Sequence, residues 1–435
     1  MSGARQISAF DRELDRRLVA LREQGLGRSL RRVDSPQGTR IRVNGRELLN
    51  FSSNDYLGLA NHPSLKEAAA MAVAEHGVGA GASRLICGSL APHHELEEAL
   101  ASFKGTEAAL TFSTGYATAL GTIPALVGKG DVVVIDKLVH ACLVDAARLS
   151  GAKLRVFAHN DLNDLADILK WADRVRSPKS EARSPRSDLR PPTSGIRHPN
   201  DRPRVLIVTE SVFSMDGDLA PLRELVELKD RYGAWLMVDE AHAIGIFSAS
   251  RRGLVDEFGL TDRVEVQMGT LGKALGVSGG YLTGSRVLVD YLINRARSFI
   301  FSTAPAPATA AAARAAVDLV HSDEGRRRCE QLWARVAECR AGLAPDGWQG
   351  RPEAKSTSAS PILPLIIGNE AEAVRVAAAL LDQGVFIPAI RYPTVARGSA
   401  RLRLTLSAEH TADDLARLRQ ALATVVPRSV FRVPQ

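Results

Sequence analysis

The sequence predicts an α/β protein in which a mostly parallel sheet covered by helices forms the larger domain and a smaller α+β domain follows it. Short apolar runs alternate with helical stretches from Phe51 to about residue 284. These runs are continuously apolar, as in strands buried on both faces, instead of alternating between apolar and polar residues. After about residue 286 the strand candidates are more widely spaced and the helical stretches are longer.

The first fifty residues are expected to form a helical arm and a short hairpin. Residues 1–25 mix acidic and basic side chains in an amphipathic helical pattern and lack the apolar stretch of a secretory signal. In the segment RIRVNGRELLNF, the pair Asn44-Gly45 separates two strand-like runs. Asn-Gly readily adopts the positive φ angles of a two-residue hairpin turn, so this segment predicts two antiparallel strands.

The larger domain, residues 51–290, should consist of strands with helices between them. Helical patterns cover 62–77 and 221–233, and the second begins at a proline and stops at a glycine. The apolar runs that predict strands lie at 107–112, 131–136, 153–157, 204–210, 234–240, 264–270 and 279–284.

Residues 291–435 predict the smaller domain. A long helical stretch rich in alanine and arginine covers 307–342, and a second helix covers 370–384. Strand candidates lie at 361–368, 385–395 and 401–411. This mixture of long helices and separated strands is typical of an α+β arrangement.

Most of the excess positive charge comes from one segment. The chain has a formal net charge of +7, yet residues 174–204 alone hold nine Lys and Arg against three Asp and Glu, together with six of the 21 prolines. A segment with so little apolar surface cannot offset the entropy lost on ordering, so we expect a disordered basic insertion. The remainder of the chain is nearly neutral, which argues against nucleic acid as a partner.

Hydropathy and cysteine usage narrow the class of protein further. No run of 18 or more apolar residues occurs, so no membrane-spanning helix is expected. The four cysteines form no Cys-x-x-Cys pair and show no metal-binding spacing. We therefore expect a cytoplasmic protein with reduced cysteines, no metal site and no membrane partner.

A single lysine, Lys273, stands in the glycine-rich segment TLGKALGVSGG directly after a predicted buried strand. A phosphate-binding P-loop would need a glycine in place of Gln267 and a hydroxyl residue in place of Ala274, so that motif is excluded. A solvated loop lysine is the ordinary alternative. However, open α/β sheets bind ligands where their parallel strands end, and a lysine partly removed from water there can attack a carbonyl group to form a Schiff base. The glycines would leave room for a flat cofactor.

The chain also contains the other groups that pyridoxal phosphate needs. Asp239 ends an apolar strand, where it could keep the pyridine nitrogen protonated, and His242 follows it. Gly115 and Tyr116 open a helix after another strand, where backbone N–H groups could bind a phosphate. Each feature has a structural alternative, because such residues also cap ordinary turns and helices. Together with Lys273, they favour the cofactor.

Six motifs, in this order, resemble those of the α-oxoamine synthases. This family consists of pyridoxal-phosphate-dependent enzymes with the aspartate-aminotransferase-like fold, called fold type I. The resemblance runs from about residue 10 to the C-terminus and is interrupted by the insertion. The motifs are NFSSNDYLGL (50–59), FSTGYATALG (112–121), TESVFSMDGD (209–218), VDEAHAIG (238–245), GTLGKALGVSGG (269–280) and YPTVARGSARLRLTL (392–406).

The resemblance implies roles for individual residues. Lys273, His140 and Asp239 match the catalytic Schiff-base lysine, the histidine that stacks on the cofactor ring and the partner of the pyridine nitrogen. His242 matches the residue that bonds the ring hydroxyl. The other cofactor contacts implied are Gly115, Tyr116, Ser214, Thr270 and, toward the phosphate in the partner subunit of a homodimer, Ser302 and Thr303. Asn54 and Arg391 match residues near the substrate carboxylate. The further substrate-side residues implied are Arg28, His140 and Thr394.

Within the family, the motifs are most similar to those of the member that acts in biotin biosynthesis. This similarity implies condensation of L-alanine with a pimeloyl thioester of coenzyme A or acyl carrier protein, and a homodimer with shared active sites. Sister members that join glycine or serine to other acyl thioesters remain an alternative, as does a non-catalytic homologue. Val139 and Cys142 stand where the pattern leads us to expect small hydroxyl residues. Tyr392 stands where the biotin-pathway member more often has proline, and it leaves the amino-acid and acyl preference open.

Overall fold

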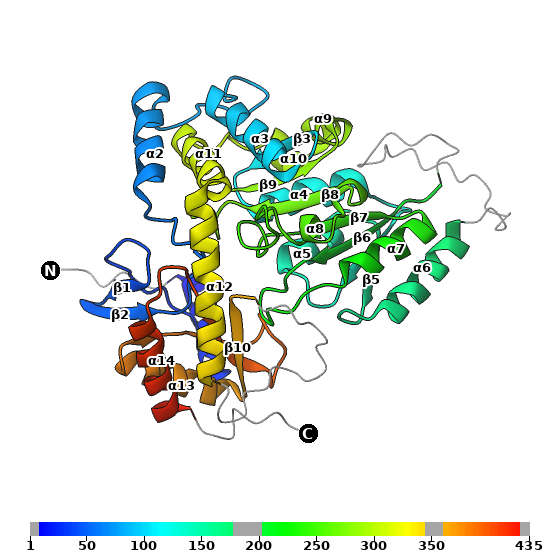
Figure 1. Ribbon diagram of the computed structural model, residues 1–435. Helices are drawn as coiled ribbons and strands as arrows, with labels where there is room; N and C mark the ends of the chain where they lie inside the picture. The colour runs from blue at the N-terminus through cyan, green and yellow to red at the C-terminus, as the bar shows by residue number, and fades with distance from the viewer. Residues whose placement is uncertain (1–7, 177–201, 344–359, 427–435) are drawn as a thin grey trace.

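A central sheet of seven strands, in the order β3-β9-β8-β7-β6-β4-β5, organises the larger part of the chain (Figure 1). The computed structural model describes residues 8–176, 202–343 and 360–426, so most of the predicted insertion lies outside the described residues. Only β9 runs antiparallel to its neighbours. The strands are β3 (Ala108–Phe112), β4 (Val132–Asp136), β5 (Lys153–Phe157), β6 (Val205–Glu210), β7 (Trp235–Asp239), β8 (Val266–Thr270) and β9 (Gly280–Gly284).

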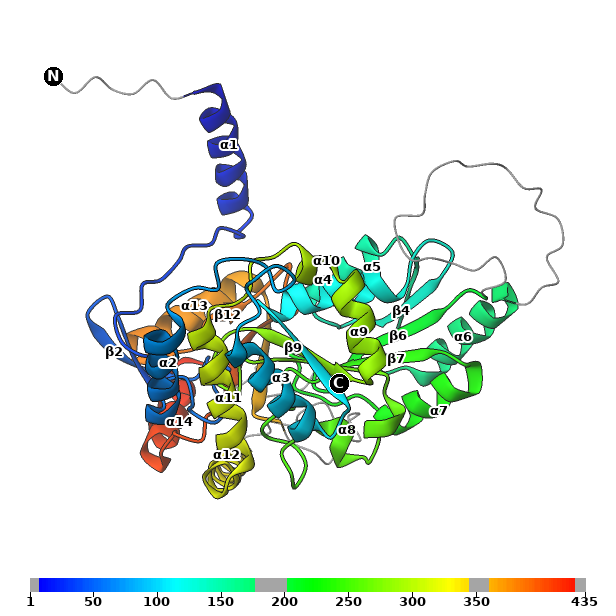
Figure 2. The ribbon, with the colours of Figure 1, turned by 90° about the horizontal axis from the view of Figure 1, so that it is seen from above.

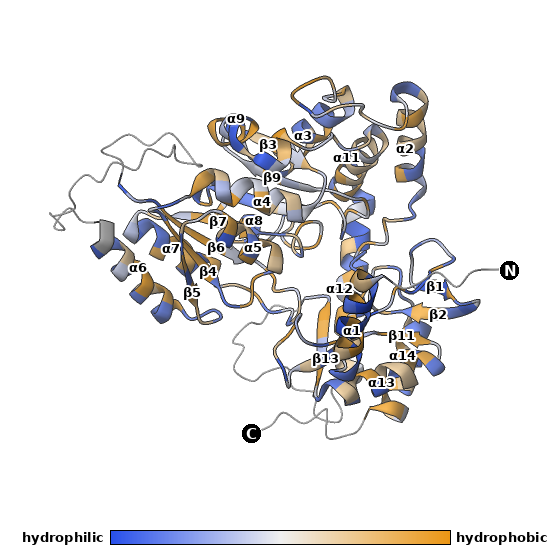
Figure 3. Cartoon of the chain, turned by 180° about the vertical axis from the view of Figure 1, so that it is seen from behind, coloured by the Kyte–Doolittle hydropathy of each residue, from blue (hydrophilic) through white to orange (hydrophobic). Residues whose placement is uncertain are grey.

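The seven strands confirm the sequence prediction to within two residues, but one of them is not buried on both faces. Strands β4 and β6 are buried along their whole length, and Figure 3 shows such central strands in the hydrophobic colour. Strand β5 lies at the sheet edge, where only Phe157 is buried. Lys153 and Arg155 on this strand instead cover the ring of Trp171, at 4.6 Å and 4.4 Å from its centroid. The expectation of full burial was therefore wrong for β5.

Helices cover both faces of this sheet. In Figure 2, α4 (Gly115–Leu126) and α5 (Ala141–Leu149) lie on one side, and α6 (Leu162–Arg176) and α7 (Leu222–Tyr232) lie on the other. Helix α7 buries Leu222, Leu225 and Val226 and ends at Gly233, whose φ of 56° lies in the left-handed region that favours glycine. The predicted helix over 221–233 is therefore confirmed, as is 62–77, which forms α2 (Pro63–His76).

The C-terminal part contains a second sheet, in the order β10-β13-β12. Its strands are β10 (Ile362–Gly368), β12 (Ala389–Ile390) and β13 (Ala400–Thr405), and its helices are α13 (Glu370–Asp382) and α14 (Ala412–Val425). The helical stretch predicted over 307–342 is broken at Ser322 into α11 (Pro307–His321) and α12 (Asp323–Leu343). The strands predicted over 385–395 and 401–411 are shorter than expected, since β12 covers two residues and β13 ends at Thr405.

The N-terminal hairpin forms as predicted but packs with the C-terminal part. Strands β1 (Arg40–Val43) and β2 (Arg46–Asn50) pair antiparallel around Asn44 and Gly45, whose φ angles are 51° and 77°. Strand β2 also pairs, in parallel, with β11 (Val385–Phe386). The division at residues 50 and 290 therefore stays a prediction, because the hairpin adds strands to the part of the chain that follows residue 291.

Helix α1 (Ala9–Glu23) has no buried residue, and Figure 2 shows it standing away from the rest of the chain. Its apolar side chains include Phe10, Leu14 and Leu18, which are 70%, 41% and 48% exposed. Among the described residues, no helix is long and apolar enough to cross a membrane.

A buried ion pair fixes the end of β7. Lys104, the last residue of α3 (Ala91–Lys104), donates to the carboxylate of Glu240 and, at 2.5 Å, to the carbonyl of Arg252. Both side chains of the pair are almost fully buried. Glu240 also accepts a hydrogen bond of 2.9 Å from the backbone N–H of Val255. Since Glu240 directly follows Asp239, this pair holds the strand end that carries a predicted site residue.

Replacing Lys104 by methionine should lower the free energy of unfolding by about 3–5 kcal/mol, because it leaves the Glu240 carboxylate buried without its cation. Urea unfolding followed by far-UV circular dichroism measures the change. The matched control is Lys170→Met, which removes a largely exposed partner of Asp167 and should change the free energy by at most about 0.5 kcal/mol. An equally small effect for Lys104→Met would contradict a structural role of the buried pair.

Candidate active site

The polar residues predicted for a cofactor site meet at the carboxyl edge of the central sheet. The register places Glu210, the last residue of β6, opposite Asp239, the last residue of β7. Asp239 also lies opposite Met268 on β8, and Lys273 stands in the loop after that strand. Because parallel strands end at the same edge, loops that are far apart in sequence converge there.

Lys273 points at a histidine on the neighbouring loop. Its Nζ lies 2.8 Å from Nε2 of His242. Burial lowers the pKa of the Lys273 amine, against the opposing charges of Asp239 and Glu210. Glycine is required at Gly276 because its φ is +68° and a Cβ there would lie 2.5 Å from the backbone nitrogen of Ala60. At this position the glycine serves a close approach of two backbones, not the cofactor space that the sequence suggested.

The opposite nitrogen of His242 contacts a tyrosine that the sequence did not single out. The hydroxyl of Tyr56 lies 2.7 Å from Nδ1 of His242, and the tyrosine side chain is fully buried. Burial lowers the pKa of His242 well below its ordinary value, and the charge of Lys273 lowers it further. The imidazole is therefore neutral, with one nitrogen donating and the other accepting. Tyr56 lies within the quoted motif NFSSNDYLGL, but its tyrosine resembles any core aromatic residue in the sequence.

Two carboxyl groups stand side by side at the strand ends. Asp239 accepts a hydrogen bond of 2.8 Å from the N–H of Ala241, and burial raises its pKa. Glu210, a second residue missed at the sequence level, is also buried and accepts a hydrogen bond from the N–H of His140. Burial, followed by the charge of Asp239, raises the pKa of Glu210 to about 8. One negative charge therefore predominates on this pair at neutral pH.

His140 caps the start of α5, and its side chain contacts Cys142, one of the residues that depart from the family pattern. Its Nδ1 lies 3.2 Å from the N–H of Cys142, which donates to it, and 3.0 Å from the Sγ of the same residue. Burial lowers the pKa of His140, and the charge of Lys273 acts in the same direction. Burial raises the pKa of the Cys142 thiol, so it keeps its proton and can donate to Nδ1. A thiol in place of the expected hydroxyl thus preserves the donor.

The predicted phosphate-binding residues begin helix α4 close to β8. Thr114 caps this helix by accepting a hydrogen bond of 2.9 Å from the N–H of Ala117, while Gly115 and Tyr116 form its first turn. Thr270 lies beside this turn: a Cβ atom added to Gly115 would be 3.8 Å from the Cβ of Thr270. The Thr270 hydroxyl donates to the carbonyl of Gly279 at 2.9 Å. Backbone N–H groups at such a helix start can bind an anion.

A buried arginine, Arg403 on β13, also reaches this region. It donates to the carbonyl of Ser214 and, at 3.0 Å, to the side-chain oxygen of Asn54. Its Nη2 is buried and has no hydrogen-bond partner among the described residues. The positive charge of Arg403 also contributes to lowering the pKa of Lys273. This residue lies in the motif YPTVARGSARLRLTL. Arginines that alternate with apolar residues along a strand are ordinarily exposed, so the sequence did not indicate that Arg403 is buried.

The remaining substrate-side predictions lie farther out. Arg391 donates to the backbone carbonyls of Gly25 and Gly27, the latter at 2.8 Å, and so holds the N-terminal arm. Arg28 and Thr394 are exposed. The structure brings these residues near one another through the arm, and among the described residues none of them forms a hydrogen bond or ion pair with Lys273.

Ser302 and Thr303 follow helix α10 (Arg297–Ile300), and Thr303 forms a β-bridge with Ser83. Within the described part of one chain, neither hydroxyl has a hydrogen bond to the residues around Lys273. Thr303 is exposed and Ser302 is partly exposed.

A separate cavity of about 860 Å³ opens at the other edge of the sheet. It is lined by Trp235 and Val266, at the starts of β7 and β8, and by Gly284, at the end of the antiparallel β9. None of the predicted site residues lines it. The described residues contain no cluster of three or more His, Cys, Asp or Glu suited to a metal ion.

Comparisons with known proteins agree with the resemblance drawn from the motifs. Curated 8-amino-7-oxononanoate synthases from Geobacter sulfurreducens and Herminiimonas arsenicoxydans are 47% and 46% identical over 408 residues. These matches cover 94% and 93% of this chain and 96% and 97% of the relatives.

Solved structures show the same fold. Serine palmitoyltransferase from Sphingomonas wittichii has a TM-score of 0.82 and 29% identity, covering 99% of this chain and 100% of that one. A serine palmitoyltransferase from S. paucimobilis, solved with a PLP–myriocin aldimine, has the same TM-score at 28% identity, covering 97% and 99%. An 8-amino-7-oxononanoate synthase from Francisella tularensis has a TM-score of 0.67 and 25% identity, covering 87% and 96%.

The family model for class I and II aminotransferases matches residues 46–422, nearly the whole described chain. With this match and the curated relatives, the resemblance and the fold class inferred from the sequence are confirmed. The chain belongs to the class I and II aminotransferase family and, within it, to the family of the 8-amino-7-oxononanoate synthases.

Proposed function

We propose that the chain catalyses the pyridoxal-phosphate-dependent condensation of L-alanine with a pimeloyl thioester, giving 8-amino-7-oxononanoate, carbon dioxide and a free thiol in biotin biosynthesis. The observation that carries the proposal is the meeting of Lys273, His242 and Asp239 at one sheet edge of this family's fold. The curated relatives, which are 40–47% identical over more than nine-tenths of the chain, carry the name of this reaction's product.

The residues at the site fit pyridoxal phosphate. The carboxylate of Asp239 suits a protonated pyridine nitrogen, the amine of Lys273 suits an aldehyde, and the helix start at Gly115 suits a phosphate. Ser214 and Thr270 would make further contacts. When bound, the cofactor supplies an electron sink for the negative charge that develops at the α-carbon of the substrate.

In this mechanism Lys273 removes the proton from the α-carbon and later returns it. Its lowered pKa increases the unprotonated fraction of the amine at neutral pH. Neutral His242 accepts or donates at Nε2 without adding a charge, while Tyr56 fixes the ring from the other side. The Lys273 amine can therefore keep its hydrogen bond to His242 whether or not it carries the extra proton.

Asp239 and Glu210 divide the charge of the site between them. The pKa of Glu210, about 8, keeps its carboxyl mostly protonated at neutral pH. The negative charge of the pair then stays on Asp239, where it can balance a proton held on a ring nitrogen. His140, whose lowered pKa keeps its ring neutral, can pack against a flat ring without repelling a cation.

Arg403 is the residue that we assign to the carboxylate of the amino acid. Its unpartnered Nη2 lies in a buried setting, where a guanidinium N–H requires an acceptor. Asn54 orients the same guanidinium through a hydrogen bond of 3.0 Å. The resemblance implied Arg391 for this carboxylate, but its guanidinium already donates to the carbonyls of Gly25 and Gly27 in the N-terminal arm.

We further propose that the enzyme works in the cytoplasm as a homodimer with shared active sites. Ser302 and Thr303 lie at the surface of one chain, where they could reach the phosphate held by a second copy. The exposed apolar residues of α1 would also be covered by a partner.

The proposed reaction is tested by a substrate panel. The purified protein, loaded with pyridoxal phosphate, should release thiol from pimeloyl-CoA in the presence of L-alanine and should form 8-amino-7-oxononanoate, identified by mass spectrometry. Serine with palmitoyl-CoA, and glycine with acetyl-CoA or succinyl-CoA, should give much lower rates. Turnover confined to one of these other pairs would contradict the proposal and assign the chain a sister reaction.

Replacing Lys273 by alanine should lower kcat by about 10²–10⁴-fold, because the base that moves the α-proton is lost. The free energy of unfolding of the cofactor-free protein should stay within about 1 kcal/mol of wild type, measured by urea titration. Lys170→Ala, on the exposed face of α6, is the control and should retain wild-type kcat. Near-normal turnover of Lys273→Ala would refute the assignment.

Replacing Arg403 by glutamine should lower kcat/KM for alanine on the order of a hundredfold, chiefly through KM, because a charged partner of the carboxylate is removed. The KM for pimeloyl-CoA should change less. Arg375→Gln, on the exposed surface of α13, provides the control. A loss equal for both substrates would mean that Arg403 supports the fold instead of binding the amino acid.

A further inference from the structure

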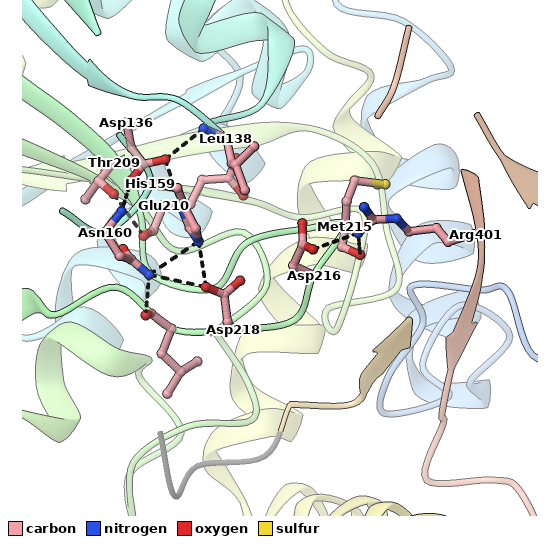
Figure 4. Close-up of polar contacts among 11 residues, drawn as sticks. Asp136, Leu138, His159, Asn160, Thr209, Glu210, Met215, Asp216, Asp218 and Arg401 are labelled. Carbon is pink, nitrogen blue, oxygen red and sulfur yellow. Dashed lines mark hydrogen bonds and ion pairs between the residues drawn. The ribbon is translucent and has the colours of Figure 1, made fainter. Parts of the chain in front are cut away.

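His159, which is not among the residues predicted to contact the cofactor, lies between two of the loops that form the candidate site. His159 follows β5, and Figure 4 shows its ring between the side chains of Asp136 and Asp218. The distance from Nδ1 to the carboxylate of Asp136 is 3.0 Å, and the distance from Nε2 to the carboxylate of Asp218 is 2.7 Å. The ring of Phe213 packs edge-on against it, with the centroids 4.4 Å apart.

Both ring nitrogens of His159 therefore face carboxylate oxygens, which accept hydrogen bonds, so both nitrogens should carry a proton. Burial alone would lower the pKa of this imidazole, but the hydrogen bonds and charges of Asp136 and Asp218 outweigh burial and raise it to about 9. These two carboxylates are the charged groups that act on the ring. At neutral pH His159 is an imidazolium that bridges them.

The first carboxylate controls the loop of His140. Asp136, the fully buried last residue of β4, accepts a hydrogen bond of 2.7 Å from the N–H of Leu138. It also accepts one of 2.9 Å from the N–H of Asn160. Leu138 lies two residues before His140, so the Asp136 carboxylate sets the turn that leads into the predicted stacking residue.

The second carboxylate belongs to the residue whose backbone closes the loop of Ser214. The carbonyl of Asp218 accepts a hydrogen bond of 3.0 Å from the N–H of Phe213, and the N–H of Gly217 donates to the carbonyl of Phe213 at 2.8 Å. The side-chain amide of Asn160 holds the Asp218 carboxylate at 3.2 Å. Ser214, whose carbonyl meets Arg403, lies inside this closed loop.

The same loop is held from its other side by the C-terminal sheet. Arg401 on β13 forms an ion pair of 2.7 Å with Asp216 and donates to the carbonyl of Met215 at 3.2 Å (Figure 4). The loop of Ser214 is thus fixed between His159 on one side and Arg401 on the other. Loss of the His159 bridge would leave the loop attached to the C-terminal sheet and, on the other side, to the neutral side-chain amide of Asn160, which donates to the Asp218 carboxylate and to the carbonyl of Leu219 at 3.1 Å.

We propose that His159 is a positioning residue, whose protonated ring ties the loop of His140 to the loop of Ser214 and so fixes both cofactor-facing loops relative to each other. This inference rests on the proposed function for its kinetic consequences, but the bridge itself is a property of the folded chain. His159 touches neither Lys273 nor Asp239 in any contact of the described residues and acts through the two loops alone.

The bridge has a defined pH dependence. The pKa of His159 is raised above its unfolded value of about 6.5, so its contribution is complete below that pH and is lost as the pH rises through about 9. Above that pH, one nitrogen of a neutral ring would face a carboxylate without a proton between them. The charged link between the two loops would then be lost, leaving the neutral hydrogen bonds of Asn160, and the cofactor and turnover should both be affected on the alkaline side.

The protonation is measured first, on the full-length holoenzyme labelled with ¹⁵N-histidine. Long-range ¹H–¹⁵N spectra from pH 6.5 to 10 should show one imidazole with both nitrogens protonated up to a midpoint near 9. His159→Gln should remove that signal and thereby assign it, and Asp218→Asn should shift its midpoint downward. A His159 ring that titrates below pH 7 would overturn the proposal.

The positioning role is measured with the same variants. His159→Gln should lower kcat at pH 7.5 on the order of tenfold to a hundredfold, with a smaller change in KM, and should lose the alkaline fall of activity centred near pH 9. It should also release pyridoxal phosphate faster, as followed by loss of its visible absorbance on dialysis. The control is His76→Gln, at the end of α2 beside Glu75, which should behave as wild type.

The outcomes separate this inference from the proposed function. If His159→Gln matches His76→Gln in kcat, pH profile and cofactor release, the positioning role is wrong. If His159→Gln does not fold, Asp218→Asn keeps the pair with Asp136 and must show the same loss of kcat and faster cofactor release. If wild type fails to use alanine and pimeloyl-CoA, the proposed reaction is wrong, while the titration and cofactor release still decide the role of His159.

Discussion

The candidate active site depends on removing several ionisable groups, wholly or partly, from water at the carboxyl edge of one sheet. Lys273, Asp239 and Glu210 sit within a region from which water is largely removed, and removal of water disfavours each of their charged forms. Such groups are tolerated only where neighbours compensate them. The same burial that costs stability lowers the pKa of the lysine and raises that of Glu210, which is the condition for acid–base chemistry at neutral pH.

The surrounding fold provides this compensation through contacts between distant parts of the chain. Lys104 neutralises Glu240 behind the end of β7, so the residue next to Asp239 cannot move without breaking a buried ion pair. Arg401 and Arg403 reach from the C-terminal sheet to the loop that follows β6. The smaller sheet therefore takes part in the site directly. Strand β2 pairs with β11 in a separate sheet, which ties the N-terminal hairpin to the C-terminal part of the chain.

A departure from a family pattern can preserve the chemistry that the pattern serves. Cys142 stands where a small hydroxyl residue was expected, yet its buried thiol keeps a proton and lies 3.0 Å from Nδ1 of His140. With the backbone N–H also directed at Nδ1, the proton of His140 belongs on Nε2. The orientation of the histidine is therefore maintained by a different donor atom, and the substitution needs no change elsewhere in the site.

The sequence by itself determined the strands of the central sheet, the hairpin at Asn44-Gly45 and the candidates Lys273, Asp239 and His242, because these signals are local. Continuous apolar runs, a turn dipeptide and a charged residue directly after a strand can each be recognised within about ten residues. Only the tertiary structure decided which residues complete the site. Tyr56, Glu210 and Arg403 became functional candidates through burial and through contacts with residues 70 or more positions away in sequence. The exposure of β5 was decided in the same way, since a strand's place at a sheet edge depends on which other strands pair with it and not on its own residues.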